Sequence, residues 1–184
     1  MSDTNSRAII LSLAAVLILT VAALIASLFI PFNVDEPATI QLLTGEAEII
    51  TPGQPTVSAA DQARLNINQT LNMLPGSEAQ IDFAFDYGRA HLVLYGPAQL
   101  TLVESYHRAT ALGHVLSRRH YVLTLEQTQG SIHYSFAGTD PSFAEADVTI
   151  HLPNGDYTPD SPCWRIDIPL SGEPQIESFD SCNG

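Results

Sequence analysis

The chain has 184 residues, enough for one membrane segment and one domain of ordinary size and too few for a second folded domain. Twenty acidic residues stand against seven basic ones, and the formal net charge of −13 argues against nucleic acid or an anionic bilayer as the main partner. The sequence contains no lysine, which excludes Schiff-base, lysine-activated and P-loop chemistry.

A long apolar segment lies near the N-terminus. Residues 8–32 carry no charged side chain. As a helix, this segment would reach about 37 Å, enough to cross a hydrocarbon core of about 30 Å with some tilt. We therefore predict a transmembrane helix over 8–32 after a cytoplasmic stub over 1–7. A cleaved signal peptide is the alternative, although its apolar part is usually about 7 to 15 residues long.

The charges beside this segment indicate its orientation. Arg7 precedes the segment, and Asp35 and Glu36 follow it directly. Because positive charge favours the cytoplasmic side, we expect the N-terminus inside and the rest of the chain outside. The predicted localisation is the cell membrane, with a single pass and an extracytoplasmic C-terminal domain.

The remaining chain has the pattern of strands. Residues 33–39 are expected to form a linker, and from Ile40 to Leu152 apolar and polar side chains alternate. The predicted fold is mostly β: one N-terminal transmembrane helix followed by a single all-β domain over 40–152. An antiparallel roll, a sandwich and a short β-solenoid-like stack all fit the alternation.

A weak repeat of glycine followed by alanine marks strand starts at Gly45, Gly76, Gly88 and Gly96. Alternation then predicts which side chains face the core. These are Ala79, Ile81, Phe83 and Phe85, then Ala90, Leu92 and Leu94, then Ala98, Leu100 and Leu102. Further strands are expected over Arg64–Leu74, Tyr121–Gln127, Ser131–Phe136 and Val148–Leu152. A hairpin turn is expected near Gln129–Gly130.

Residues 153–184 form a proline-rich tail with five prolines. Only Trp164, Ile166 and Ile168 alternate there, and the prolines would confine such a strand to a sheet edge. Cys163 and Cys182 are predicted to pair as a disulfide, because pairing is the default in an oxidising exterior compartment. The tail would then be fastened to the domain.

The stretch from Ile40 to about Leu152 resembles the FecR-like domain family. The matching segments are Leu43–Ile49, Leu74–Ile81 and Leu125–Ile132. The resemblance implies an extracytoplasmic β module beside a single span. Founding members of that family relay an iron-siderophore signal to a sigma factor through a cytoplasmic helical segment, whereas seven residues precede the span here. Direct sigma-factor capture is therefore not expected, and the proline-rich tail replaces the family's signalling subdomain.

The segment Tyr106–His120 is basic within an acidic domain. It is expected to form a long loop or a brief helix, and long loops are often functional. An acidic partner or lipid head groups could bind it. A solvated insertion whose arginines pair with local acids is the alternative. The partner-binding candidates are His107, Arg108, His114, Arg118, Arg119 and His120.

Two sets of residues in the sequence could provide metal ligands. His91, His133 and His151 fall out of phase with the apolar faces of their strands and could form an outward ladder for a transition metal. Asn154, Asp156 and Asp160 offer oxygen ligands for calcium. Neither set has the spacing of a known site, so no metal and no cofactor is predicted. The sequence also lacks a nucleophile elbow, an HExxH motif and a glycine-rich phosphate loop.

Together these observations predict a non-enzymatic, membrane-anchored, extracytoplasmic FecR-like module. It would bind or sense, acting through an envelope or membrane protein partner. One alternative is an accessory single-span subunit of a larger membrane complex. A second is a β domain that binds envelope polysaccharide.

Overall fold

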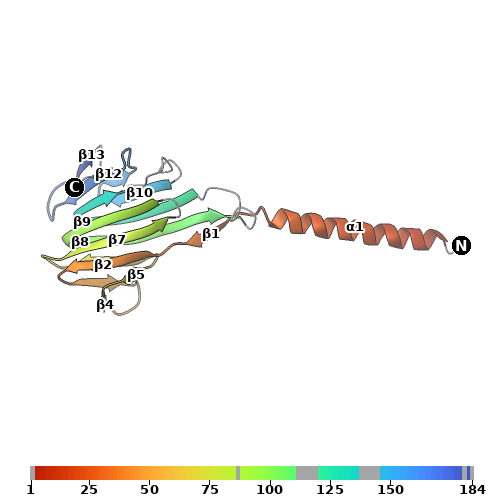
Figure 1. The fold of residues 1–184 in the computed structure, drawn as a ribbon, viewed down its shortest axis with the longest axis horizontal. Helices are drawn as coiled ribbons and strands as arrows, with labels where there is room; N and C mark the ends of the chain where they lie inside the picture. The colour runs from red at the N-terminus through yellow and green to blue at the C-terminus, as the bar shows by residue number, and fades with distance from the viewer. Residues whose placement is uncertain (1–2, 86–87, 111–119, 137–145, 180–181, 183–184) are drawn as a thin grey trace. The chain divides into compact units, whose positions relative to one another are not determined.

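The computed structural model of the protein describes residues 3–85, 88–110, 120–136, 146–179 and 182. That part of the chain contains a helix and thirteen strands (Figure 1). The chain forms two compact units, one that contains α1 and one that contains nearly all of the strands. The elements are α1 (Asp3–Ser27), β1 (Phe32–Asp35), β2 (Ala38–Thr44), β3 (Ala47–Ile50), β4 (Val57–Ser58), β5 (Ala63–Leu65), β6 (Gln69–Met73), β7 (Glu78–Phe85), β8 (Gly88–Ala109), β9 (His120–Ser135), β10 (Ala146–Leu152), β11 (Gly155–Tyr157), β12 (Cys163–Ile168) and β13 (Gln175–Phe179).

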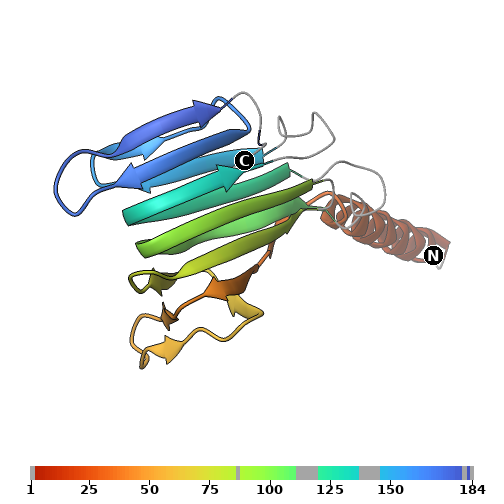
Figure 2. The same cartoon turned by 60° about the vertical axis from the view of Figure 1, so that its left-hand side comes forward.

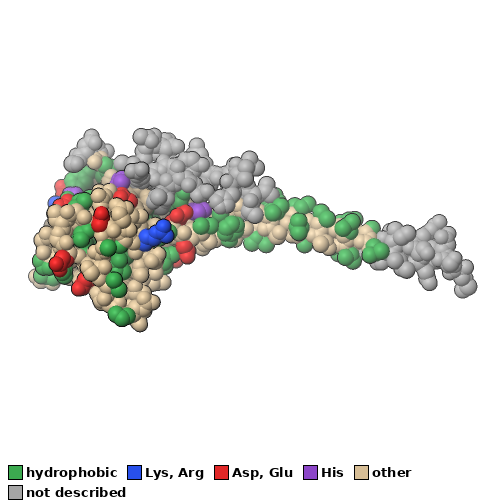
Figure 3. Space-filling model, turned by 60° about the horizontal axis from the view of Figure 1, so that its bottom comes forward, with side chains coloured by type: hydrophobic (Ala, Val, Ile, Leu, Met, Phe, Trp, Pro, Cys, Tyr) green, Lys and Arg blue, Asp and Glu red, His purple; other side chains and the backbone are tan. Residues whose placement is uncertain are grey.

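The helix α1 carries apolar side chains along its described length (Figure 3). It ends at Ser27, whose hydroxyl donates to the carbonyl of Leu24 at 2.7 Å. The predicted end at Phe32 is therefore wrong. Pro31 disfavours helical geometry at the residue before it, and Phe32 already begins β1. Within the described residues, we find no helix whose length and hydropathy would let it cross a membrane.

The mostly β prediction is confirmed, and the alternation assigned the core correctly. In β7, Ala79, Ile81 and Phe83 are each at most 1% exposed, and the side chain of Phe85 lies outside the described part of the structure. In β8, the residues predicted to face the core are fully buried: Ala90, Leu92, Leu94, Ala98, Leu100 and Leu102. The orientation of these side chains therefore follows directly from the period-two pattern.

The strands form one open sheet, with β8 and β9 as neighbours at its centre. The first part of β8 pairs with β7 and the later part with β6. The first part of β9 pairs in parallel with β10, and the last part pairs antiparallel with β12. One hydrophobic cluster contains residues from both sets of flanking strands. The open sheet therefore folds over a single core, and Figure 2 shows its two layers.

The two central strands are continuous where turns were expected. β8 runs through Gly96 and β9 runs through Gly130, so the predicted strand start at Gly96 and the predicted hairpin near Gln129–Gly130 are both wrong. Gly130 has φ +91°, and a Cβ placed there would overlap the backbone of Pro97 and Ala98 in β8. The left-handed conformation bends the strand without ending it, as glycine does at β-bulges.

Two other boundaries differ from the expected ones. The predicted linker 33–39 contains most of β1 and the start of β2, and Ala38 is fully buried. The predicted strand Arg64–Leu74 is divided into β5 and β6. Asn68 separates them in a left-handed conformation, φ 64°, which asparagine tolerates better than most residues.

The proline-rich tail belongs to the same sheet. β12 pairs with β9 on one side and with β13 on the other, so it is not the edge strand that its prolines suggested. Trp164 is 1% exposed and stacks on Tyr134 and Phe136, with ring centroids 5.3 and 5.0 Å away. The tail therefore supplies the largest buried side chain of the core.

Candidate binding groove

His107 is not an accessible loop residue, contrary to the prediction. It lies in β8 and is 1% exposed. Its Nδ1 atom is 3.0 Å from the carboxylate of Glu36, and its ring lies 5.7 Å from that of Tyr121. Ser105 holds Glu36 in place, because its hydroxyl donates to the Glu36 carbonyl at 2.6 Å. His107 therefore has a structural position and cannot contact a partner directly.

The other candidates of the basic segment fall into two groups. Arg108 lies in β8, where its side chain is exposed, and His120 begins β9, where its Nε2 atom is 2.8 Å from Asp147. The ends of the expected loop, 106–109 and 120, are therefore strand. The candidates that lie outside the described residues are His114, Arg118 and Arg119.

Cys163 and Cys182 lie at disulfide distance, with their Cα atoms 5.4 Å apart. Cys163 begins β12, and Cys182 lies close to the end of the chain. This separation is compatible with the disulfide that the sequence predicts. The disulfide holds Cys182 beside the start of β12, where Phe179 and both cysteines line a cavity.

The three histidines considered as possible metal ligands have different neighbours in the structure. His91 is paired with Asp82, and Nδ1 of His151 is 2.6 Å from Asp156. His133 lies beside the ring of Tyr95 instead. Among the described residues, no three histidine, cysteine or acidic side chains cluster closely enough to hold a metal ion. Each of these histidines therefore belongs to a separate local contact.

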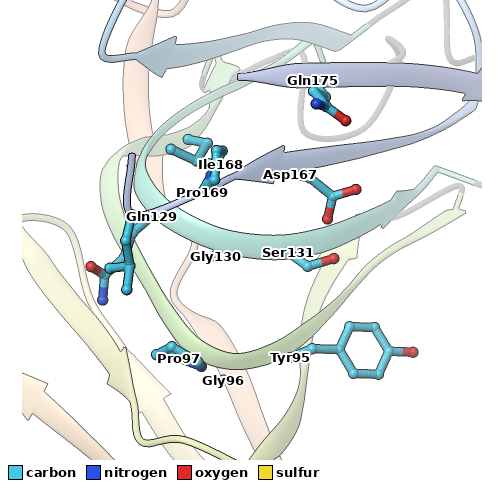
Figure 4. Close-up of a pocket in the computed structure, with 11 residues that line it drawn as sticks. Tyr95, Gly96, Pro97, Gln129, Gly130, Ser131, Asp167, Ile168, Pro169 and Gln175 are labelled. Carbon is cyan, nitrogen blue, oxygen red and sulfur yellow. The ribbon is translucent and has the colours of Figure 1, made fainter. Parts of the chain in front are cut away.

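Two adjoining cavities lie on the side of the sheet that faces away from the core. One has a volume of about 400 Å³, with His91, His133 and Phe179 in its wall. The other, about 380 Å³, contains Ser131 and Asp167 (Figure 4). Both volumes fall within the usual range of small-ligand sites. We call the two cavities together the outer-face groove.

Strand register assembles the polar wall of this groove from residues far apart in sequence. Ser131 in β9 is paired with Asp167 in β12, which is paired with Gln175 in β13. Tyr95 in β8 packs edge-on against His133, with ring centroids 5.4 Å apart and an interplanar angle of 72°. In Figure 4, Tyr95, Ser131 and Asp167 extend to the same side of three neighbouring strands.

Tyr95 joins the two cavities, because it lines both of them. It is 40% exposed, although most large side chains of these strands are in the core. Apolar side chains, among them Val93 and Leu170, form the remaining walls. The groove thus combines an aromatic platform, apolar walls and a few polar groups, which is the usual composition of a ligand site.

Three polar atoms of the groove residues are buried without a hydrogen-bond partner in the described part of the chain. They are the hydroxyl oxygen of Ser131, Nε2 of His133 and Nε1 of Trp164. A polar atom that is desolvated and unpaired costs about 1–3 kcal/mol. Such atoms are uncommon in native proteins.

The charge state of His133 follows from its surroundings. Burial and, to a smaller extent, the positive charge of Arg165 lower the pKa of His133 below its usual 6.5. Asp167 and Glu177 act in the opposite direction but do not reverse the shift. The ring is therefore neutral at pH 7, so it has one nitrogen that donates and one that accepts a hydrogen bond.

Comparisons with family models, curated proteins and solved structures find no match. The FecR-like resemblance stays a prediction, and the groove has to be interpreted from its own chemistry.

Sequence reasoning missed Tyr95, Ser131 and Asp167 as site residues. Their strands were recognised in part, but the three residues come from β8, β9 and β12. A weak signal was available, because Ser131 and His133 alternate with the buried Ile132 and Tyr134. That alternation marks an outward face and cannot show which strand lies beside it.

Proposed function

We propose that the β domain is a non-catalytic binding module whose ligand occupies the outer-face groove. The observation that carries this proposal is the position of Tyr95. Its ring is 40% exposed on the face of the sheet and lines both cavities. Tyrosine combines an apolar ring with a polar tip and is common at binding surfaces for that reason.

Binding is favoured over catalysis by the state of the acidic residue in the groove. The carboxylate of Asp167 forms an ion pair with Arg165, whose Nε lies 2.7 Å from a carboxylate oxygen. A carboxylate that is already paired with a cation suits recognition better than proton transfer. The neighbouring His133 offers one donor and one acceptor, as a binding residue requires.

We also propose that α1 attaches the domain to a membrane and that the domain lies outside the cytoplasm. The described apolar side chains of α1 are exposed, Leu17 and Leu19 by 66% and 69%. A helix that is apolar on all sides normally becomes buried in lipid or against other helices. The cysteine pair at disulfide distance favours an oxidising compartment. This arrangement agrees with the FecR-like resemblance, in which an envelope or membrane partner would receive the signal.

An accessory subunit of a larger membrane complex is the second candidate. The same exposed apolar surface of α1 supports it, because such a surface can pack against helices of other chains. Mild extraction followed by size analysis separates the two functions. Fixed stoichiometric partners support the subunit, whereas a chain that elutes alone supports the independent binding module. Resistance of the chain to alkaline extraction tests the attachment itself, and release into the supernatant would refute it.

The binding site is tested by photocrosslinking in native membranes. The photoreactive residue p-benzoylphenylalanine is placed at Tyr95 in one variant and at Val57 in a control. Val57 is 62% exposed on β4, and no cavity described above includes it. We expect an adduct of defined mass from position 95 and none from position 57, because only the first lies in the groove. Equal adduct patterns from both positions, or no adduct from either, would contradict the proposal.

A further inference from the structure

We infer that the groove binds an uncharged, hydroxyl-rich chain, namely a neutral oligosaccharide held in two subsites on either side of Tyr95. This inference rests on the proposed function and specifies its ligand. Each cavity has a volume near 400 Å³, and the two share the Tyr95 ring. A linear chain that crosses the ring would therefore place successive units in successive cavities.

The position of the groove on the sheet disfavours an extended peptide. A peptide strand gains most of its affinity from unpaired backbone groups at a sheet edge. The groove lies on the face of β8, β9 and β12, whose backbone groups are already paired: β9 has β12 beside it, and β12 has β13. Apart from Gly96 and Gly130, the residues that line the groove there offer side chains to a ligand. A ligand whose own polar groups are hydroxyls fits such a surface better than one that must satisfy a peptide backbone.

The buried unpaired atoms indicate the kind of polar group that is missing. The hydroxyl of Ser131 and the neutral ring of His133 can each donate or accept. A ligand hydroxyl also does both, so it can pair with either atom. Both atoms are closed to solvent, so a ligand reaches them only after a neighbouring side chain moves. We assign this movement to Tyr95, which contacts His133 and is partly exposed.

Two other polar side chains of the groove can also both donate and accept hydrogen bonds. Gln129 and Gln175 each carry an amide that donates through its nitrogen and accepts through its oxygen, and both line the cavity with Ser131 (Figure 4). The exposed ring of Tyr95 offers an apolar surface against which the CH face of a sugar ring can pack.

The charge of the domain argues for an uncharged chain. Its net charge is −13, and the groove itself contains Asp167, with Glu177 on the adjacent β13. A polyanion would be repelled both by the domain as a whole and by this carboxylate. Arg165 is close but already paired with Asp167. A neutral oligosaccharide meets no such barrier.

Calorimetric titration of the full chain tests this inference, in a detergent without a sugar head group. The probes are linear hexasaccharides of glucose and of N-acetylglucosamine, with a sulfated heparin-derived hexasaccharide for comparison. We expect saturable binding of at least one neutral probe and much weaker binding of the sulfated one. No binding of either neutral probe would overturn the inference, as would equal affinity for the sulfated probe.

Variants assign any binding to the groove. Tyr95→Ala should weaken it at least about tenfold, and Tyr95→Phe should retain most of it, because the ring is kept. Ser131→Ala should weaken it about threefold to tenfold. Ser58→Ala, an exposed serine on β4, is the matched control and should have no effect. Melting curves verify that each variant folds, and unchanged affinity in both Tyr95→Ala and Ser131→Ala would refute the assignment.

The two proposals fail in different ways. If position 95 crosslinks to a protein in native membranes while neither neutral hexasaccharide binds, the groove is a binding site and the saccharide inference is wrong. If neither crosslinking nor saccharide binding occurs, both are wrong.

Discussion

A single glutamine supports the bend that shapes the groove. Gln127 is fully buried, and its amide nitrogen donates to the carbonyls of Gly130 at 2.9 Å and Ile166 at 3.1 Å. Its amide oxygen accepts from the hydroxyl of Tyr134 at 2.8 Å. Burial raises the pKa of Tyr134 well above its usual 10, so this hydroxyl keeps its proton. The network links β9 to β12 at the point where the groove begins.

Replacing Tyr134 with phenylalanine removes the hydroxyl that, among the described residues, donates to the buried amide oxygen of Gln127. Because an unsatisfied buried acceptor is costly, we expect Tyr134→Phe to lower the free energy of unfolding by about 1–3 kcal/mol. Urea denaturation measures the change. Tyr157→Phe, at a half-buried tyrosine, should stay within about 0.5 kcal/mol of the parent protein. Equal effects of the two substitutions would contradict the importance of the network.

The lowered pKa of His133 predicts how the stability of the protein depends on pH. Its protonated form is disfavoured in the folded protein, so its pKa lies below 6.5 there. As the pH falls through 6.5, the unfolded chain takes up this proton first, and the contribution of His133 to stability decreases. The contribution is complete above that pH. NMR titration of the imidazole signals, assigned with His133→Gln, measures the folded pKa.

Arg165 lowers this pKa, so Arg165→Gln should raise it toward the usual value. Arg64→Gln, on β5, serves as the control and should leave the His133 titration unchanged. A His133 midpoint at or above 6.5 in the parent protein would contradict the described environment.

Two long bent strands, rather than several short hairpins, organise the domain. Side-chain contacts from Thr124 to Glu104 and from Thr128 to Gln99 run along β8 and β9 in opposite chain directions. The two strands are therefore antiparallel partners across both layers. Gly130 passes close to β8 at the bend, where any side chain would meet backbone atoms.

Gly53 and Gly130 have similar φ angles but different surroundings. Comparing them separates the cost of a left-handed conformation from the cost of steric crowding. Gly53 has φ +75° and open space around it, whereas Gly130 has φ +91° and would overlap Pro97 and Ala98. Gly53→Ala should therefore cost only the left-handed conformation, about 1–2 kcal/mol. Gly130→Ala should cost about 1–3 kcal/mol more, because of overpacking. Urea denaturation compares them, and equal losses would show that the close approach at Gly130 does not matter.

Alternation in the sequence was sufficient to orient strand residues but not to place the bends. Ala79, Ile81 and Phe83 were assigned to the core correctly, because strand geometry alone fixes which face they share. Gly130 was interpreted as a hairpin turn, since a glycine with positive φ occurs both in turns and in bulges. Only the pairing of the first part of β9 with β10 distinguishes a bulge at Gly130 from a hairpin turn. That pairing involves residues about 25 positions apart.

The whole molecule depends on the last segment of the chain for both its core and its groove. β12 supplies Trp164 to the core, and Cys182 joins the chain end to the start of this strand. The two cysteines are 19 residues apart. Cross-linking a loop of this length contributes about 3 kcal/mol in the chain-entropy description.

Breaking this link is therefore expected to destabilise the protein as a whole. Cys163→Ser combined with Cys182→Ser should lower the free energy of unfolding by about 3 kcal/mol, measured by urea denaturation. Adding a reductant to the parent protein should produce a similar loss, and the double variant should not respond to it. A parent protein as stable with reductant as without it would contradict this role.

The sequence indicated a binding domain but not its site. The basic segment was singled out by composition, yet His107 is buried against Glu36. The groove depends on Tyr95, Ser131 and Asp167, which meet only after three strands have paired. A surface that is assembled by register leaves no contiguous motif, so it becomes visible only in the folded chain.

Accessibility of the groove in native membranes tests the central claim most directly. Gln175 lines the groove and is exposed, and Gln54 is exposed in a turn away from the described cavities. Gln175→Cys and Gln54→Cys are labelled with a maleimide in native membranes and again after purification. We predict that Gln175→Cys reacts more slowly in membranes than after purification, because its ligand covers it, while Gln54→Cys reacts at one rate. Equal rates for Gln175→Cys in both preparations would contradict a ligand in the outer-face groove.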